Sequence, residues 1–112
     1  MEEISLEPQK VERAFLVGIQ EPGMSREDAE DHLAELASLT DTMGVGVAGQ
    51  QIARVARPTP QLYLGAGKAD EIKALADAHE ADVIIFDTDL SPSQQRNWEE
   101  LTGVAVIDRQ EV

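Results

Sequence analysis

The chain has 112 residues, enough for one domain, and its 22 acidic residues outweigh 9 lysines and arginines to give a formal net charge of −13. It contains no Cys and no apolar run near the roughly 20 residues that span a bilayer, which excludes disulfide frameworks, thiolate chemistry and a membrane-spanning helix in this sequence. We expect a cytoplasmic protein with no secretory signal and no membrane partner, whose acidic surface repels nucleic acid over most of its area.

The acidic residues are unevenly distributed along the chain. No Asp or Glu occurs from Thr42 to Ala69, and Arg54, Arg57 and Lys68 give this segment a local charge of +3. This acid-free segment has two interpretations: it contains buried strands and a loop, or it forms a face that meets an anion.

The first half of the chain predicts a strand and a helix. Residues 1–12 lack periodicity and are expected to be a flexible leader, whereas the apolar run at residues 14–19 is typical of a strand buried on both faces. Ser25 then caps a helix whose apolar residues follow the i, i+3, i+4, i+7 spacing and which ends at Gly44. Residues 45–57 look partly extended, and their glycines leave a strand and a mobile loop both open.

The second half alternates short apolar runs with helical patterns. Its predicted elements are a loop at residues 57–60, a short strand at 62–64, a helix after the Gly65–Lys68 turn, a buried strand at 82–86, a helix from Ser91 to Gly103 and a strand at 104–107. Ser91, Pro92 and Gln94 form the sequence pattern of a capping box with proline at the first helical position. Trp98 is expected to pack this helix onto the sheet.

This alternation predicts an α/β fold, with a mostly parallel sheet of four to five strands and helices packed on both faces. The domain is expected to span residues 13–112, and because the chain ends four residues after Asp108 without a stop signal, we expect a longer protein. In parallel sheets ligands bind at the carboxyl ends of the strands, so the Gly65–Lys68 turn, Asp87–Asp89 and Asp108-Arg109 should gather there.

The turn Gly65-Ala66-Gly67-Lys68 is the first candidate binding motif. Glycines and free N–H groups at a helix start favour anions, and a lysine adds charge. The motif is incomplete as a phosphate loop, because Ala69 stands where a Ser or Thr would hold magnesium. Gly65, Gly67 and Lys68 are therefore candidates for nucleotide or anion binding, with a tight turn of modest anion preference as the alternative.

Other polar residues give weaker signals. Asp87 and Asp89 follow a strand, but they are expected to hydrogen-bond the turn before Ser91 rather than to hold a metal. His32 and His79 lack partners for a catalytic triad, so no catalytic and no metal site is expected. The run Gln94–Asn97 is more polar than capping requires, and it is interpreted either as an ordinary exposed helix or as part of one patch with the cations of the acid-free segment.

Three segments together resemble the N-terminal domain of the HflX family of GTP-binding proteins. Residues 62–71 are similar to the family's Y-I-G-x-G-K-x-x-E segment, residues 86–97 to its F-D-x-x-L-S-P-x-Q-x-R-N segment, and residues 106–109 to its V-x-D-R segment. Residues 13–18 fit the opening strand, so the resemblance covers roughly residues 11–112 in register.

The resemblance implies the N-terminal part of a GTPase that binds the large ribosomal subunit. In the family a helical segment and a G domain follow this domain, and these are its implied partners together with ribosomal RNA. GTP and Mg are expected only in the G domain, so this fragment is expected to be no enzyme. Arg54, Arg57, Lys68, Gln95 and Arg96 are the ribosome-contact candidates, chosen by charge and position. The alternative is an ATP-binding domain with weak ATPase or RNA-remodelling activity through Gly65–Lys68.

Overall fold

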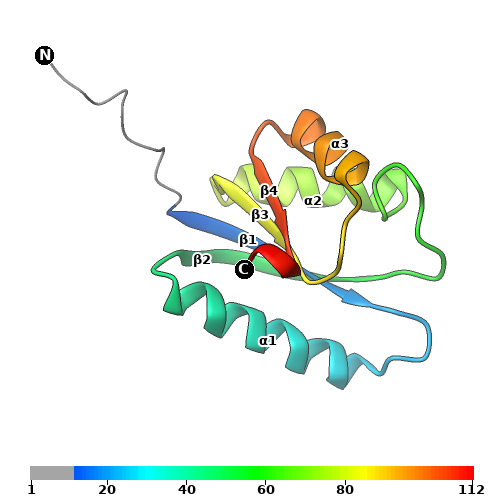
Figure 1. The fold of residues 1–112 in the computed structure, drawn as a ribbon, viewed down its shortest axis with the longest axis horizontal. Coiled ribbons are helices and arrows are strands. Elements are labelled where there is room, and N and C mark those ends of the chain that lie inside the picture. Colours follow the sequence, from blue (N-terminus) through cyan, green and yellow to red (C-terminus); the bar gives the residue numbers. More distant parts are fainter. Residues whose placement is uncertain (1–11) are drawn as a thin grey trace, which may run out of the picture.

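The computed structural model describes residues 12–112, and the predicted leader at residues 1–12 lies almost wholly outside them. The elements are β1 Arg13–Gln20, α1 Arg26–Thr42, β2 Gly46–Arg54, α2 Ala66–Ala78, β3 Val83–Phe86, α3 Pro92–Thr102, β4 Ala105–Asp108 and a short 3₁₀ helix, η2 Arg109–Glu111. All four strands are parallel, in the order β2-β1-β3-β4. As Figure 1 shows, α1 covers one face of the sheet and α2 and α3 cover the other, which confirms the predicted class.

β1 lies at the centre of the sheet because its apolar run can be buried on both faces. Ala14 and Leu16 pack with Leu33 and Leu36 of α1 on one face. On the other face β1 packs against α2 and α3 in a larger core that includes Phe15, Val17, Ile19, Ile72, Phe86, Trp98 and Val106. The strand is thus buried on both sides, as its sequence predicts.

α1 begins and ends where the sequence indicates. The Ser25 side chain accepts a hydrogen bond from the Asp28 N–H, and Glu27 and Asp28 lie in the first turn, where carboxylates favour the helix dipole. Gly44 follows the end of the helix with φ +86°, a conformation that favours glycine. No helix of residues 12–112 is both long and apolar enough to cross a membrane.

The segment between α1 and α2 differs in part from the prediction. Residues 46–54, where the sequence permits a strand or a loop, form the edge strand β2, with a register shift at which Ala48 is the extra residue. The predicted short strand at residues 62–64 is wrong. Tyr63 exchanges two backbone hydrogen bonds with Thr59 and has φ +70°, so this part closes a turn within the loop and cannot join the sheet.

α3 matches its prediction most closely. Ser91 and Gln94 form the capping box, Pro92 opens the helix, and Gly103 ends it in the left-handed conformation. Trp98 is fully buried, packs its ring 4.8 Å from that of Phe86, and donates from Nε1 to the Leu62 carbonyl at 2.6 Å. Trp98 therefore joins α3, β3 and the loop before α2.

We predict that Trp98→Phe destabilises the domain by about 1–3 kcal/mol, because the Leu62 carbonyl loses its donor while most of the ring packing stays. Urea unfolding followed by far-UV circular dichroism measures this change, since Trp98 is the only Trp and the variant therefore has no indole fluorescence. Arg96→Ala, on the exposed side of the same helix, should change stability by less than about 0.5 kcal/mol. Equal stability of Trp98→Phe and the unmutated chain would contradict the role assigned to this bond.

The capping box gives a second prediction. Ser91→Ala should cost about 1 kcal/mol, because the Gln94 N–H loses its acceptor at the start of α3. Ser93→Ala is the matched control, since Ser93 is exposed in the same turn and caps nothing. Thermal unfolding should separate the two variants, and equal midpoints would show that the cap contributes nothing.

Candidate functional site

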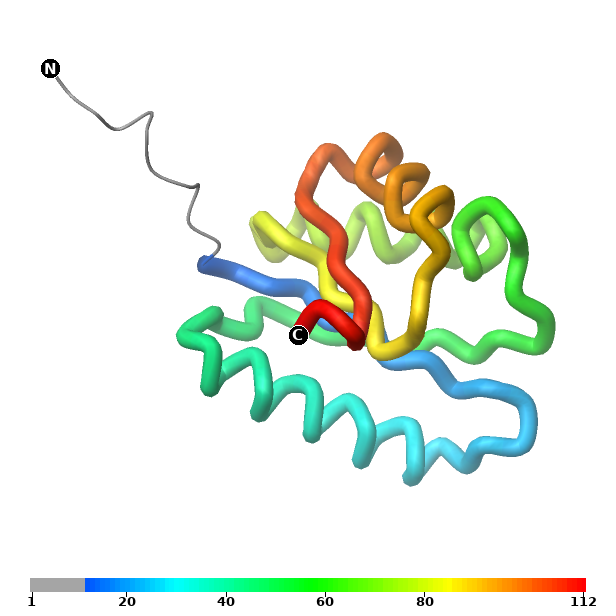
Figure 2. Tube along the Cα trace, viewed as in Figure 1, coloured from blue at the N-terminus to red at the C-terminus, as the bar shows by residue number. Residues whose placement is uncertain are grey.

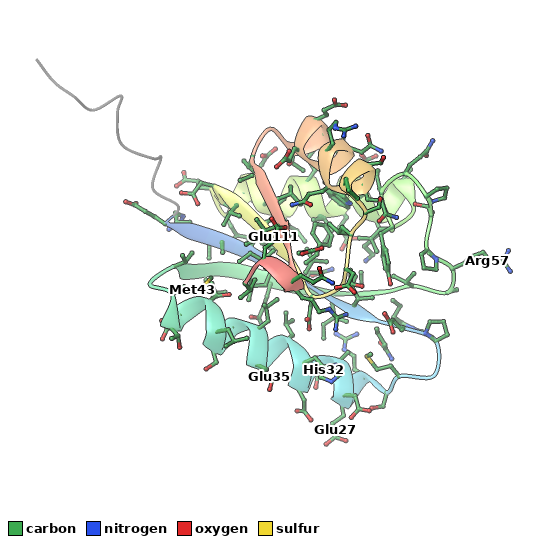
Figure 3. All side chains as sticks on the ribbon, in the orientation of Figure 1. Glu27, His32, Glu35, Met43, Arg57 and Glu111 are labelled. Atoms are coloured by element: carbon green, nitrogen blue, oxygen red, sulfur yellow. The ribbon has the colours of Figure 1, made fainter. Side chains whose placement is uncertain are left out.

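Three cations of the acid-free segment lie together at the carboxyl end of the sheet. Arg54 ends β2, Arg57 lies in the following loop, and Lys68 stands in the first turn of α2; all three line one cavity of about 270 Å³. Figure 3 shows the Arg57 side chain projecting from the end of the molecule, away from the acidic residues labelled on α1. The interpretation of the segment as a cationic face is thus supported by the positions of its charged residues.

Most of the Gly65–Lys68 segment belongs to a helix rather than to a loop. α2 begins at Ala66 with Gly65 as its N-cap, so Gly67 and Lys68 lie within the first turn. No side chain caps this helix start and no acidic residue lies in its first turn. A Cβ added at Gly65 or Gly67 would meet nothing within 4 Å, so the fold of residues 12–112 does not need glycine there. The turn into the helix is therefore shorter than its sequence indicates.

Lys68 is also engaged by neighbours. Its Nζ lies 3.1 Å from Glu71 Oε1, and Glu71 Oε2 accepts from Gln51 Nε2 at 2.8 Å. The Lys68 side chain is about one-third exposed, so this pair is worth little in water and leaves the lysine able to reach a second anion. Of the three cations, Arg54 and Arg57 form none of the ion pairs found within residues 12–112.

The two candidates on α3 do not lie in this cavity. Gln95 has an internal role, because its Nε2 donates to the Val106 carbonyl at 2.6 Å and to Glu111 Oε1 at 2.8 Å. Arg96 is exposed, whereas Trp98 on the same helix is fully buried. The structure thus brings Arg54, Arg57 and Lys68 together and leaves Gln95 and Arg96 apart from them.

The polar run of α3 holds the loop that carries Arg57. Gln94 Nε2 donates to the Thr59 carbonyl at 2.9 Å, and Asn97 Nδ2 donates to the Gln61 carbonyl at 2.9 Å. The Trp98 bond to Leu62 adds a third anchor in the same loop. Gln94, Asn97 and Trp98 are at positions i, i+3 and i+4, so they lie on one face of α3. In the sequence, this spacing is the signal that the polar residues hold another segment of the domain.

The same loop also reaches the turn after β1. Tyr63 Oη donates to Glu21 Oε2 at 3.4 Å. Figure 2 shows the two connections, β1 to α1 and β2 to α2, leaving the sheet at the same end. The loop is therefore tied to α3 and to the turn after β1, through residues 59–63, which follow Arg57.

Asp87, Asp89, Asp108 and Arg109 gather at the carboxyl ends of β3 and β4, as predicted. The residue that bonds the turn before Ser91 is Asp108, whose Oδ2 accepts from the Leu90 N–H at 3.0 Å, and not Asp87 or Asp89. Asp108 lies in β4 itself and is buried, which positions its carboxylate for this bond. Arg109 donates to the Asp87 carbonyl at 3.0 Å and pairs with Asp89 at 3.8 Å.

A second cavity, of about 280 Å³, adjoins these residues and is lined by His32, Glu35, Asp87 and Arg109 among others. Partial burial raises the pKa of the Asp87 carboxyl above its ordinary value, and the charges of Arg109 and His32 partly oppose this. Within the described part of the chain, no group of His, Asp or Glu side chains has the arrangement of a metal site.

Comparison with known proteins identifies the family. A family model described as "GTP-binding GTPase N-terminal" matches residues 30–112. The GTPase HflX of Akkermansia muciniphila is 41% identical over 112 residues, which is 100% of this chain and 26% of that protein. The GTPase HflX of Escherichia coli is 42% identical over 82 residues, covering 73% of this chain and 19% of that protein.

A solved structure agrees with the fold. A crystal structure of an SsGBP variant superposes with a TM-score of 0.60 at 22% identity, covering 88% of this chain and 29% of that one. The present chain spans about a quarter of the length of the curated relatives that it matches. With the family model matching most of the chain, we conclude that this protein belongs to the HflX family and corresponds to its N-terminal GTP-binding-protein domain.

Proposed function

We propose that this domain is a docking module through which an HflX GTPase contacts the large ribosomal subunit, with Arg54, Arg57 and Lys68 meeting the phosphate backbone of ribosomal RNA. In this proposal GTP and its Mg²⁺ bind in a separate G domain of the full-length protein, in the cytoplasm. The domain itself carries out no chemical step. Its binding to the ribosome is communicated to the helical segment and the G domain.

The observation that carries the proposal is the meeting of three cations at one end of a domain of charge −13. An RNA backbone is repelled by most of such a surface, so it can approach only where acidic residues are missing. Arg54, Arg57 and Lys68 stand on three consecutive parts of the acid-free segment, which are the end of β2, the loop and the start of α2.

The anchoring of the loop also supports this role. A cation on a loose loop loses side-chain and backbone entropy when it binds, and a loop that is already held avoids part of that cost. The three donors of α3 hold the Arg57 loop at Thr59, Gln61 and Leu62. The uncapped start of α2, beside Lys68, adds N–H groups that favour an anion.

ATP binding through Gly65–Lys68, the alternative function, gains no support from this geometry. The four residues do not form a phosphate-enclosing loop, because the helix begins at Ala66. The Ser or Thr that would hold magnesium is also absent, because Ala69 stands in its place.

We predict that Arg57→Glu in the full-length protein weakens binding to purified large ribosomal subunits about tenfold or more at low salt, because it replaces an attraction to phosphate by a repulsion. Co-sedimentation over a range of KCl concentrations measures both the affinity and its salt dependence. The slope of log affinity against log salt should become shallower by about 1 for each phosphate that the variant no longer neutralises.

Lys73→Glu is the matched control, since it makes the same change of charge on α2 without lining the cationic cavity. It should leave binding nearly unchanged, and Arg96→Glu tests the separate candidate on α3. A loss of binding in Lys73→Glu equal to that in Arg57→Glu would mean that only total charge matters. Unchanged binding of Arg57→Glu would remove this residue from the contact.

A further inference from the structure

The two edge strands of the sheet, β4 and β2, differ in whether side chains hydrogen-bond their outward backbone groups. At the β4 edge, the Val106 carbonyl accepts from Gln95 Nε2 at 2.6 Å and the Val106 N–H donates to Glu99 Oε2 at 3.4 Å. Two side chains of α3 thus bond the outward backbone groups in the middle of β4. This edge is closed to a further strand.

The β2 edge lacks such side-chain bonds among the residues that the structure describes. The Val55 N–H donates to the Gln20 carbonyl of β1 at 3.0 Å, and backbone groups alternate in direction along a strand. Counting back from Val55, the N–H groups of Ala53 and Gln51 face β1. The residues whose N–H and C=O face away from the sheet are Gln50, Ile52 and Arg54.

These three residues stand in the regular part of a long edge strand. The ladder is regular from Gly49 to Arg54, after the bulge at Ala48. Natural edge strands are commonly protected by proline, lysine, short length or a covering side chain. Among residues 12–112 no side chain hydrogen-bonds the backbone of Gln50, Ile52 or Arg54, and this stretch holds no proline and no lysine.

A groove of about 650 Å³ runs along this edge between the two helical layers. It is lined by Arg26, Glu30, Leu33, Gln50, Gln51, Ile52, Arg54 and Lys68. Leu33 and Ile52 supply apolar surface, and the lining holds three cations and one carboxylate. Arg26 pairs with that carboxylate, Glu30, at 3.4 Å, and Lys68 pairs with Glu71 at 3.1 Å; both pairs are solvent-accessible and weak. Arg54 forms none of the ion pairs found within residues 12–112. In Figure 1 the edge strand lies between α1 on one side of the sheet and α2 on the other.

We propose that the free edge of β2 binds an extended, acidic segment of a partner protein, which adds to the sheet as a fifth strand. The partner's backbone pairs with Gln50, Ile52 and Arg54, and its carboxylates meet Arg26, Arg54 and Lys68. This site shares Arg54 and Lys68 with the proposed ribosome contact. It differs from that contact because it also depends on the backbone of β2 and does not involve Arg57.

The groove favours a peptide strand over two other occupants. A second copy of the chain would bring two grooves of the same positive charge together, which opposes pairing of β2 with itself. Phosphate oxygens of an RNA accept from N–H groups but offer no donor to the outward carbonyls. An acidic strand supplies both backbone donors and opposite charge.

The test uses amide NMR of the domain with an acetylated peptide of alternating valine and glutamate, about eight residues long to match a typical strand. We expect slowed hydrogen exchange at the amides of Gln50, Ile52 and Arg54 and no change at Gln51 and Ala53, which already face β1. The same peptide with lysine in place of glutamate should bind about tenfold more weakly or worse. A version with proline at the alternate positions whose N–H groups would face β2 should not slow exchange at these amides. Such a peptide has no N–H to donate to the outward carbonyls of β2 and cannot form the paired strand.

Two variants isolate the backbone contribution. Gln50→Pro removes an outward N–H at an edge position, where proline is tolerated, and should abolish protection, whereas Gln50→Ala keeps the N–H and should bind as the unmutated chain does. Arg54→Glu should invert the preference toward the lysine peptide, and it keeps the test valid if Gln50→Pro fails to fold.

Three results would overturn the proposal. The first is absence of the alternating protection at millimolar glutamate peptide. The second is the same protection appearing without peptide as the domain concentration rises, which would assign the edge to a second copy. The third is protection by a single-stranded RNA but not by the peptide, which would make the groove part of an RNA contact.

Discussion

The buried Trp98 side chain is the contact on which the arrangement of the cationic end depends. Its ring fills the space between α3 and Phe86 of β3, and its Nε1 reaches the Leu62 carbonyl. A buried indole N–H needs an acceptor, so the ring can be fully enclosed only if the loop lies over it. The same packing that builds the core therefore fixes the loop that presents Arg57.

The polar residues at the start of α3 hold that loop in place. Ser91 and Gln94 start the helix, while Gln94 and Asn97 bond carbonyls of the loop with Trp98. On the neighbouring side of the helix, Gln95 and Glu99 close the β4 edge. α3 thus makes contacts within the domain. The acid-free segment instead presents groups that a partner can contact, namely the outer edge of β2 and its cations.

Elements with a strong local pattern can be predicted from the sequence, and those set by distant contacts cannot. The central strand, the caps at Ser25 and Ser91 and the stop at Gly103 follow from apolar runs and local hydrogen bonds, and the structure confirms them. Leu62–Leu64 has the composition of a strand, but the carbonyl of Leu62 bonds Trp98, 36 residues away.

The same distinction applies to the candidate site. The roles of Gln95 and Asp108 are not visible in the sequence, since each side chain bonds a backbone group of another element. The gathering of Arg54, Arg57 and Lys68 is predictable because all three lie on the single connection that leaves β2 and enters α2 at the carboxyl end of the sheet.

The most direct test of the docking proposal is photo-crosslinking of the full-length protein to large ribosomal subunits, with a photoreactive phenylalanine analogue placed at position 57 or at position 73. Arg57 lies on the anchored loop and Lys73 on α2 outside the cationic cavity, so the pair compares two surfaces of one domain. Ribosomal RNA crosslinked from position 57 and not from position 73 is the result that the proposal predicts. Crosslinks to RNA from position 73 with none from position 57 would contradict it.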